Sequence, residues 1–386
     1  MDRKLRMGMI GGGEGAFIGE IHRIAARMDG QIELVCGAFS SNPAKSKRSG
    51  ESLYLPFDRI YDTYQDMIEK ESSLSEAERM DFVSIVTPNH VHFDPAKQAL
   101  EHGFHVVMDK PITFDLNEAR KLKQTVDDTN LILCLTHTYT GYPMVKEARQ
   151  LILNGALGDI RKIYVEYPQG WLSTLLEATG NKQADWKTDP DKSGMAGCMG
   201  DIGTHAANLA EYITGLEITR LCADINTVVE GRKLDDDGSV LLKFNNGASG
   251  VLFASQVTAG EANNINIRVY GEKGGIEWKQ EEANKLQVKW QDKPAEIRRT
   301  GNDKNYLSGM ALHNTRLPAG HPEGYLEAFA NLYCNFALTV KARIEDKQPK
   351  QEWLDFPGIY EGVRGMLFIK KVMESGNSDK KWISLS

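Results

Sequence analysis

Short apolar runs alternate with amphipathic stretches along the first third of the chain. The apolar runs predict strands at residues 5–11, 32–39, 81–87, 105–108 and 131–136. Between them, apolar positions spaced three and four residues apart predict helices at residues 18–28, 64–79, 93–101 and 116–128. Strands that alternate with helices need crossover connections. We therefore expect an α/β domain with a doubly wound parallel sheet, the Rossmann type, over residues 1–138.

The pattern changes after about residue 139. A helix at 145–153 and a strand at 160–167 precede a loop-rich stretch and a helix at 201–212. Period-two alternation and short Asn/Gly turns then predict strands at residues 221–228, 239–244, 248–257, 264–270, 275–278 and 286–290. The polar segment 293–320 suggests a long surface loop. Residues 139–386 should thus form an α+β domain with an open, mostly antiparallel sheet, which binds substrate and mediates oligomerisation.

Composition narrows the class of protein. The 386 residues are too many for one compact core, and a net charge of −7 without a Lys/Arg block gives no reason to expect nucleic acid. No apolar run reaches the roughly 18 residues that span a bilayer, and no signal-like core precedes the first strand. The five cysteines are scattered and form no C-x-x-C pair. We expect a cytoplasmic protein with buried, reduced thiols and without a metal site.

The first predicted strand ends in a glycine-rich turn that leads directly into a helix. Glycine allows a tight turn and lets a pyrophosphate approach the main chain, while the helix start offers free N–H groups. The spacing Gly11-x-Gly13-x-x-Ala16 matches a short dinucleotide fingerprint, whereas closing the motif at Gly19 requires three extra residues. The alternative is a turn that only reverses the chain. The residues expected to hold the dinucleotide here are Gly11, Gly13, Gly15, Ala16, Phe17 and Ile18.

The end of the second strand should contact the adenosine ribose. A carboxylate at this point would favour NAD, but the chain has Ser40 and Ser41, with Lys45 shortly after. Hydroxyls and a cation favour NADP over NAD. The cation could equally belong to a solvated helix face.

Two further strands end in candidate chemistry. Thr87-Pro88-Asn89, with His92 beyond, should border the cofactor, because ligands bind at the carboxyl ends of parallel strands; a plain Pro-containing turn is the alternative. Asp109 and Lys110 follow the next strand, where a lysine could orient a substrate oxygen.

In the second domain, Asp201 and His205 are four residues apart, which on a helix places both on one face. A histidine can accept an alcohol proton while a carboxylate orients it. Taken singly, each of these residues has a plain structural explanation, namely a loop lysine, a capping acid or a half-buried histidine.

Together these motifs resemble the glucose–fructose oxidoreductase/inositol dehydrogenase (Gfo/Idh/MocA) family over essentially the whole chain. Family members carry Glu-Lys-Pro where this chain has Asp109-Lys110-Pro111, and often a second acid where it has Asn208. The resemblance implies that His205 acts as general base, that Lys110 binds the reacting oxygen and that Asp201 assists. Asp109 and Lys110 would also border the dinucleotide. The implied reaction is hydride transfer between NADP or NAD and a secondary alcohol of a sugar or cyclic polyol.

Substrate contacts are harder to assign from the sequence. The candidates are aromatic and polar residues, namely Trp171, Trp186, His137, Tyr142 and His321. Two other functions stay open: a glycosidase that uses bound NAD through transient oxidation, and a non-catalytic regulator that senses a dinucleotide. An uncovered face of the open sheet predicts a homodimer or homotetramer.

Overall fold

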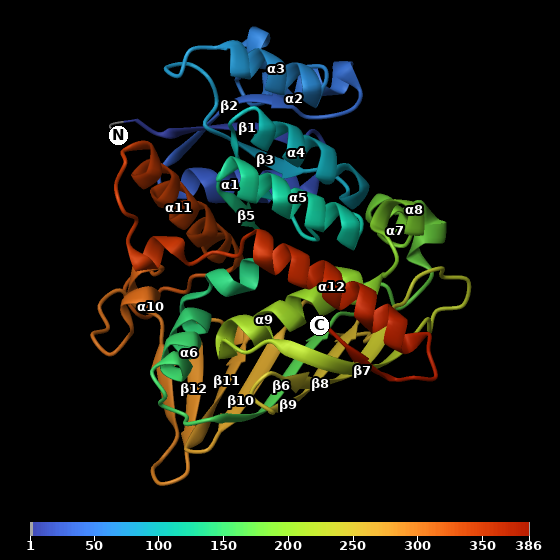
Figure 1. Cartoon of the computed structure of the whole chain (residues 1–386), viewed down its shortest axis with the longest axis vertical. Coiled ribbons are helices and arrows are strands. Elements are labelled where there is room, and N and C mark those ends of the chain that lie inside the picture. The colour runs from blue at the N-terminus through green and yellow to red at the C-terminus, as the bar shows by residue number, and fades with distance from the viewer. Residues whose placement is uncertain (1–2, 386) are drawn as a thin grey trace. The chain divides into compact units, whose positions relative to one another are not determined.

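The structure, a computed structural model, describes residues 3–385 and contains two compact units. The first unit comprises the chain up to Thr138 together with Tyr325–Val363. The second comprises Tyr139–Gly324 together with the chain from Arg364 onwards. Figure 1 shows the course of the chain through both units.

The first unit contains a parallel sheet of five strands in the order β2-β1-β3-β4-β5. Its strands are β1 (Leu5–Gly11), β2 (Ile32–Ala38), β3 (Phe82–Val86), β4 (His105–Met108) and β5 (Leu133–Leu135). Helices that connect them are α1 (Phe17–Met28), α2 (Pro43–Ser52), α3 (Tyr64–Ser73), α4 (Phe93–Glu101) and α5 (Leu116–Thr129). The strand order reverses between β1 and β3, which is where open parallel sheets bind ligands. The predicted doubly wound sheet is confirmed.

A late segment of the chain completes this unit. Helix α11 (Tyr325–Ile344) packs beside α1, and Phe329, Tyr333 and Phe336 are buried in one cluster with strand residues such as Phe82. The Tyr333 hydroxyl lies 2.7 Å from His22 Nδ1 and 2.8 Å from Ser84 Oγ, which ties α11 to α1 and β3. The expected second domain of residues 139–386 therefore needs correction, because residues 325–363 supply core to the first unit.

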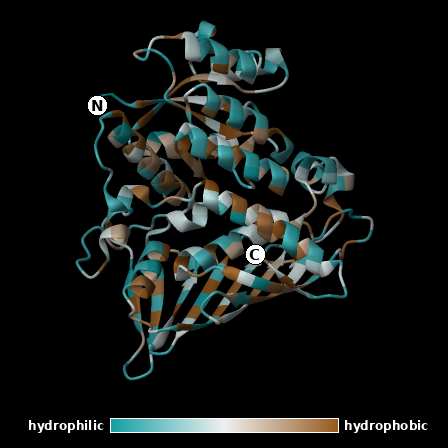
Figure 2. Ribbon diagram, viewed as in Figure 1, coloured by the Kyte–Doolittle hydropathy of each residue, from teal (hydrophilic) through white to brown (hydrophobic). Residues whose placement is uncertain are grey.

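The second unit contains a nine-stranded sheet in the order β13-β12-β11-β10-β6-β9-β8-β7-β14. Its strands are β6 (Ile160–Pro168), β7 (Ile218–Asn226), β8 (Asp237–Phe244), β9 (Ser249–Ser255), β10 (Asn266–Gly271), β11 (Gly274–Lys279), β12 (Lys285–Trp290), β13 (Glu296–Arg299) and β14 (Trp382–Ser384). All neighbouring pairs are antiparallel except β6 with β9. The open, mostly antiparallel sheet is confirmed, and Figure 2 shows the alternation of apolar and polar residues along these strands.

Helices of the second unit lie along one face of this sheet. They include α6 (Pro143–Leu153) and α9 (Thr204–Thr214), which contact β12 and β6 respectively. The short helices α7 (Lys182–Lys187) and α8 (Pro190–Ser193) lie in the stretch that we expected to be loop-rich. The last long helix, α12 (Ile359–Gly376), begins in the first unit and ends in the second.

Two predicted segments differ from the structure. The helix expected at residues 64–79 ends at Ser73, where the hydroxyls of Ser72 and Ser73 bond back to the Glu69 carbonyl. Serine hydroxyls that compete for backbone groups weaken a helix. The expected loop 293–320 contains β13 and the short helix α10 (Gly309–His313), because β13 extends the sheet as its edge strand.

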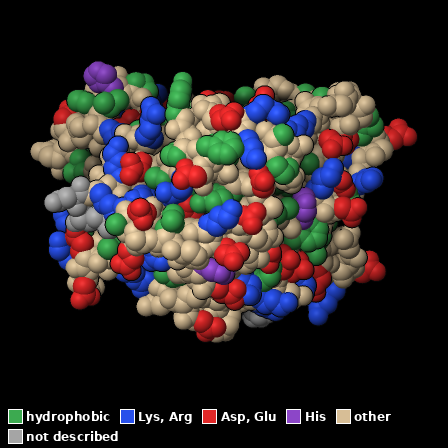
Figure 3. All heavy atoms as spheres, turned by 90° about the horizontal axis from the view of Figure 1, so that it is seen from above, with side chains coloured by type: hydrophobic (Ala, Val, Ile, Leu, Met, Phe, Trp, Pro, Cys, Tyr) green, Lys and Arg blue, Asp and Glu red, His purple; other side chains and the backbone are tan. Residues whose placement is uncertain are grey.

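The surface charges are mixed in sign (Figure 3), and the cysteines form no disulfide among the described residues. Acidic and basic side chains are interspersed over the face drawn in Figure 3. Within residues 3–385, no helix combines the length and apolarity needed to cross a bilayer. All five cysteines are free, but Cys222 and Cys334 are only partly buried, whereas we expected every thiol to be buried.

Candidate active site

The glycine-rich turn after β1 adopts backbone conformations that only glycine accepts readily. Gly11, Gly12 and Gly15 have φ values of +81°, +70° and +74°. A Cβ on Gly11 would lie 3.0 Å from the Val86 carbonyl oxygen and from Thr87, at the end of β3. A Cβ on Gly13 would lie 2.8 Å from the Phe39 carbonyl oxygen, just after β2. The turn thus brings the carboxyl ends of β1, β2 and β3 together.

Gly19, three residues beyond the end of the shorter fingerprint at Ala16, packs directly against the turn. A Cβ on Gly19 would lie 2.3 Å from Gly12 Cα, so helix α1 contacts the turn backbone to backbone. Ala16 precedes α1 and supplies no side-chain cap to it. Phe17 is 69% exposed and Gly15 has no heavy atom within 4 Å of its missing Cβ. A helix start of this kind is suited to bind an anion through its amides.

The segment after β2 is organised by hydroxyl groups. Ser46 Oγ accepts from the Phe39 amide, and Ser40 Oγ accepts from the Asn42 amide. Asn42 caps α2 by accepting from the Lys45 amide, which places Lys45 in the first turn of that helix. Ser41 is exposed. The residues expected to contact the ribose therefore lie beside the Gly13 turn.

His92 is buried and contacts two backbone carbonyls. It is 1% exposed, and its Nδ1 lies 2.7 Å from the Pro111 carbonyl oxygen while its Nε2 lies 2.8 Å from that of Thr87. Burial lowers the pKa of His92, whereas the Asp109 carboxylate and the two carbonyl contacts raise it. Both ring nitrogens are thus used inside the protein. The ring joins the loop after β3 to the loop after β4, and a contact of His92 with the cofactor stays a prediction.

Asp109 and Lys110 follow β4 as predicted from the sequence. Asp109 Oδ1 accepts from the Lys110 amide at 2.9 Å and from Thr136 Oγ1 at 3.0 Å. Lys110 and Pro111 are joined by a cis peptide bond. Burial lowers the pKa of His137 to about 3, helped by the Lys110 ammonium and opposed by Asp109. The structure therefore places His137 in the first unit near Lys110. Thr87, Pro88 and Asn89 border the neighbouring strand end.

Asp201 and His205 lie in the second unit, at the start of α9. Asp201 is within a π-helical turn, Met199–Gly203, and His205 is in the first turn of α9. Such single π turns inside helices are common at functional sites. Asp201 Oδ2 accepts from Lys187 Nζ at 2.7 Å and from Gln256 Nε2 at 2.9 Å. The carboxylate is therefore held in one orientation by two segments far apart in the sequence.

His205 is 9% exposed and lies against tyrosine rings. Its ring centroid is 4.9 Å from that of Tyr139 and 6.2 Å from that of Tyr167. The two tyrosine hydroxyls bond to each other, and burial raises the pKa of Tyr139. This aromatic wall excludes water from one side of the imidazole.

Amide side chains extend the wall. Asn263 accepts from Tyr167 Oη at 2.7 Å and from Gln169 Nε2 at 2.5 Å, and it donates to Tyr139 Oη at 3.0 Å. Gln169 Oε1 in turn accepts from the Trp171 indole N–H at 3.0 Å. The network connects the tryptophan to the tyrosines beside His205.

The predicted substrate residues of the second unit lie in three different environments. Trp171 and Trp186 lie within 6.0 Å and 5.7 Å of Lys187 Nζ and so belong to the Asp201 cluster. Tyr142 is 3% exposed and packs against Tyr139 and Trp278, which makes it part of the unit's core. His321 is exposed and lies 3.3 Å from the Pro318 carbonyl oxygen; within residues 3–385, no contact found places it in the cluster.

Several residues of this site escaped the sequence analysis. Tyr139 follows the last strand of the first unit, whereas Gln256 and Asn263 lie in the connection after β9. None of them belongs to a local motif. Of the three, only Asn263 lies between two predicted strands, in a polar stretch that is equally typical of a surface loop.

Comparison with known proteins identifies the class. Residues 5–137 match the model of an oxidoreductase family with an NAD-binding Rossmann fold, and residues 145–277 match the GFO/IDH/MocA C-terminal domain. An oxidoreductase from Sinorhizobium meliloti is 41% identical, with a TM-score of 0.89, over 99% of this chain and 100% of that one.

Two further proteins are similar over nearly their whole lengths. An inositol dehydrogenase homolog from Azotobacter vinelandii, solved with NADH and myo-inositol, is 33% identical with a TM-score of 0.90 over 100% of this chain and 98% of that one. The levoglucosan dehydrogenase of Pseudarthrobacter phenanthrenivorans is 26% identical over 92% of this chain and 99% of its own. The fold and the site thus define an NAD-binding oxidoreductase. The chain belongs to the Gfo/Idh/MocA family.

Proposed function

We propose that the protein oxidises a secondary alcohol of a sugar, glycoside or cyclic polyol and transfers the hydride to NADP or NAD. The observation that carries this proposal is the buried His205 imidazole, which follows the turn with Asp201, a carboxylate fixed by Lys187 and Gln256. An imidazole held in a dry, oriented position is suited to remove an alcohol proton. Relatives named for myo-inositol and levoglucosan support polyhydroxylated rings as the substrate class.

The first unit fits a dinucleotide. A Cβ on Gly12 would lie 2.8 Å from Val86 and one on Gly13 would lie 2.7 Å from Ser49, so only glycine lets the turn pack this closely. The start of α1, which has no side-chain cap, offers its amides to a pyrophosphate. Gly11, Gly13, Gly15, Ala16, Phe17 and Ile18 would hold it, with Thr87, Pro88, Asn89 and Asp109 at the neighbouring strand ends. When bound, the nicotinamide supplies the hydride acceptor.

The protein's own groups supply position and proton transfer. His205 removes the hydroxyl proton, and Lys110 donates a hydrogen bond to the same substrate oxygen as negative charge develops there. Asp201 orients the imidazole or a neighbouring hydroxyl, while Trp171 and Trp186 offer apolar faces for ring C–H groups. Lys110 and His205 act on the same oxygen in this mechanism, so both side chains must reach one substrate molecule.

We propose that both dinucleotides bind and that NADP binds better. Ser40, Ser41 and Lys45 lie where a carboxylate would select against a 2′-phosphate. A thermal-shift comparison of NAD and NADP, repeated with Lys45→Glu, tests this. The variant should weaken NADP binding more than NAD binding. An equal effect on both dinucleotides would show that Lys45 does not read the phosphate.

The activity is tested by following reduced nicotinamide with inositols, aldoses and anhydrosugars. His205→Asn should lower kcat by about 10²–10⁴ without changing dinucleotide affinity. The matched control is His321→Asn, an exposed histidine whose loss should leave kcat unchanged. Unchanged turnover in His205→Asn would overturn the assignment. Sugar release without net reduction would indicate a glycosidase, and dinucleotide binding without any turnover a regulator.

We also propose that a second copy of the chain covers the outer face of the sheet. Tyr164, Val251 and Leu241 are direct neighbours across β6, β9 and β8, and Leu241 is 48% exposed. A central apolar row of this kind is typical of an interface. Leu241→Lys should shift the mass measured by light scattering towards the monomer, whereas Lys121→Glu, at an exposed position on helix α5 of the first unit, should leave the mass unchanged.

A further inference from the structure

The connection between β7 and β8 carries three buried charged residues that the proposed reaction does not use. Arg232 and Asp236 have side chains 1% and 0% exposed, and Asp235 is 5% exposed. A buried charge is costly unless it is paired and fully hydrogen-bonded. The partners of these groups therefore indicate what the connection holds in place.

Asp235 binds the backbone that leads into the catalytic turn. Its carboxylate accepts from the amides of Gly197 at 2.6 Å and Met199 at 2.7 Å, and its carbonyl accepts from Cys198 at 2.8 Å. Burial raises the pKa of Asp235, while the two amide bonds lower it. Three consecutive amides are thus fixed immediately before Asp201.

The contact between Asp235 and this backbone is close. A Cβ on Gly197 would lie 2.3 Å from the Asp235 carbonyl oxygen, so the approach is possible only with glycine. Met199 begins the π turn that contains Asp201, and α9 with His205 follows without a break. A shift at Asp235 would therefore be transmitted to both residues.

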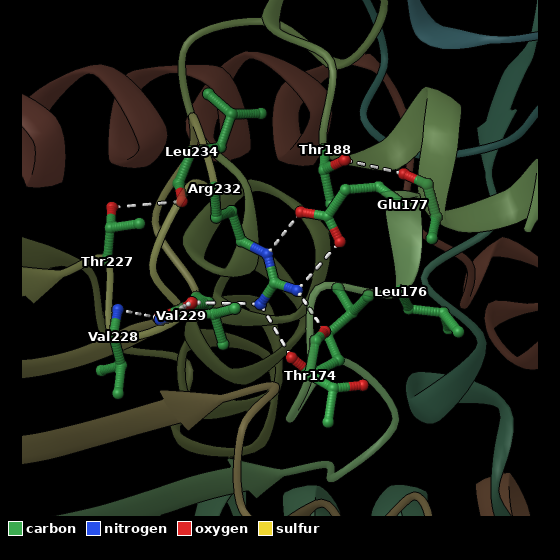
Figure 4. A network of polar contacts seen from close by, with 12 residues as sticks. Thr174, Leu176, Glu177, Thr188, Thr227, Val228, Val229, Arg232 and Leu234 are labelled. Atoms are coloured by element: carbon green, nitrogen blue, oxygen red, sulfur yellow. Dashed lines mark hydrogen bonds and ion pairs between the residues drawn. The ribbon is translucent and has the colours of Figure 1, made fainter. Parts of the chain in front are cut away.

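Asp236 binds a different partner, Arg232. Figure 4 shows the Arg232 guanidinium between Glu177 and Thr174. The guanidinium donates to both carboxylate oxygens of Glu177 at 2.9 and 3.0 Å and to Asp236 at 3.0 Å. It also donates to the carbonyls of Leu172 and Thr174, each at 2.8 Å. Leu172 directly follows Trp171, so this network fixes the backbone beside the tryptophan.

We propose that the adjacent carboxylates Asp235 and Asp236 are positioning residues for two different parts of the active site. Asp235 positions the turn that carries Asp201 and His205. Asp236, acting through Arg232, positions the segment that carries Trp171. The inference rests on the proposed function. One short connection thereby sets the geometry of the proton acceptor and of a substrate-binding wall separately.

The two positions should affect different kinetic constants. A catalytic base displaced by about 1 Å loses about 10² in rate, because the reacting atoms are no longer aligned. A displaced binding wall loses contacts made equally in the ground state and the transition state, which raises KM and leaves kcat unchanged.

The test compares Asp235→Asn with Asp236→Asn, two isosteric changes at adjacent buried carboxylates. Asp235→Asn should lower kcat about 10²-fold with little change in KM. Asp236→Asn should raise KM about tenfold with little change in kcat, because the oxygen that accepts from Arg232 and from the Val229 amide is lost or must be shared. Dinucleotide affinity should stay at the wild-type value in both. The proposal is overturned if Asp235→Asn keeps the wild-type kcat or if both variants change kcat and KM alike.

Amide hydrogen exchange of the unaltered protein covers the case in which a variant does not fold. The amides of Gly197 and Met199 should exchange as slowly as those of β8, because Asp235 binds them. Fast exchange of these amides would overturn the positioning role. This measurement needs no substrate, so a failed dehydrogenase assay and a failed positioning role give separate results.

Discussion

The two units form their parts of the candidate site in different ways, one with backbone and the other with side chains. In the first unit the backbone forms most of the site, because glycines with positive φ and a contact between Gly12 and Gly19 shape the turn. In the second unit side chains from distant segments meet, as when Lys187 and Gln256 bind Asp201. A backbone site tolerates almost no change at its glycines. A side-chain network should instead lose function in steps.

The largest effect is expected from Gly19→Ala, which tests the role of the backbone in the first unit. The added Cβ would lie 2.3 Å from Gly12 Cα, and because that atom is backbone it cannot rotate away. We expect helix α1 to move off the turn, with dinucleotide affinity reduced at least about tenfold and the free energy of unfolding reduced by about 1–3 kcal/mol. Titration with NAD and NADP and denaturant unfolding measure the two effects.

The matched control is Gly365→Ala in helix α12. A Cβ there would have no heavy atom within 4 Å, and alanine in a helix interior is about 0.5–1 kcal/mol more favourable than glycine. It should therefore stabilise the protein without changing dinucleotide affinity. Wild-type affinity in Gly19→Ala would contradict the close packing at Gly12.

This difference explains how much the sequence could predict. The first unit's strands, its glycine turn and the position of Lys110 follow from local patterns, because each local element supplies its own part of the site. The identity of the closing glycine did not follow, since only the three-dimensional contact shows Gly19 against Gly12. The sequence assigns His92 to the cofactor because it follows a strand end, and it does not show that the ring contacts the Pro111 carbonyl after the next strand.

Less of the site in the second unit could be predicted from the sequence. Asp201 and His205 stand out by their spacing, but the sequence does not show that Asn263 bonds Tyr167 and Gln169. Those partners are about a hundred residues away, and hairpin register decides whether they meet. The same limit hid helix α11, whose amphipathic pattern does not show that it packs into the first unit.

A smaller effect is expected from Asn263→Asp, which tests the stepwise behaviour of the side-chain network. The change keeps the acceptors for Tyr167 and Gln169 but replaces the donor to Tyr139 with a second carboxylate oxygen. We expect kcat/KM to fall about tenfold, because a buried hydrogen bond of this kind contributes about 1–3 kcal/mol. Steady-state kinetics with the best substrate of the panel measure it.

The neighbouring change Asn264→Asp is the control for Asn263→Asp. Asn264 donates to Glu261 in an exposed contact, outside the network beside His205. Its kcat/KM should therefore remain at the wild-type value. If Asn263→Asp also keeps full activity, the amide network is not needed to hold the aromatic wall.

The smallest expected effect concerns the framework of the first unit and its dependence on pH. His105, the first residue of β4, accepts the Ile132 amide at Nδ1, so protonation there would break the bond. Burial lowers its pKa to about 4, helped by the Arg343 guanidinium and opposed by Asp81. In the unfolded chain the pKa returns to about 6.5. Below pH 6.5 the unfolded chain therefore binds a proton that the folded chain does not.

The contribution of His105 to the free energy of unfolding should thus be fully present above pH 6.5. It should fall as the pH drops towards 4, by up to about 1.4 kcal/mol per pH unit. His105→Gln should remove that part of the slope, whereas His102→Gln, at an exposed histidine, should not. Denaturant unfolding between pH 4 and 7 measures both. Burial also lowers the pKa of His22 to about 4 and that of His137 to about 3. Both histidines are still present in His105→Gln, so part of the pH dependence of the unfolding free energy must remain in this variant. An unchanged slope in His105→Gln would mean that the ring is protonated in the folded protein and that β4 is held without it.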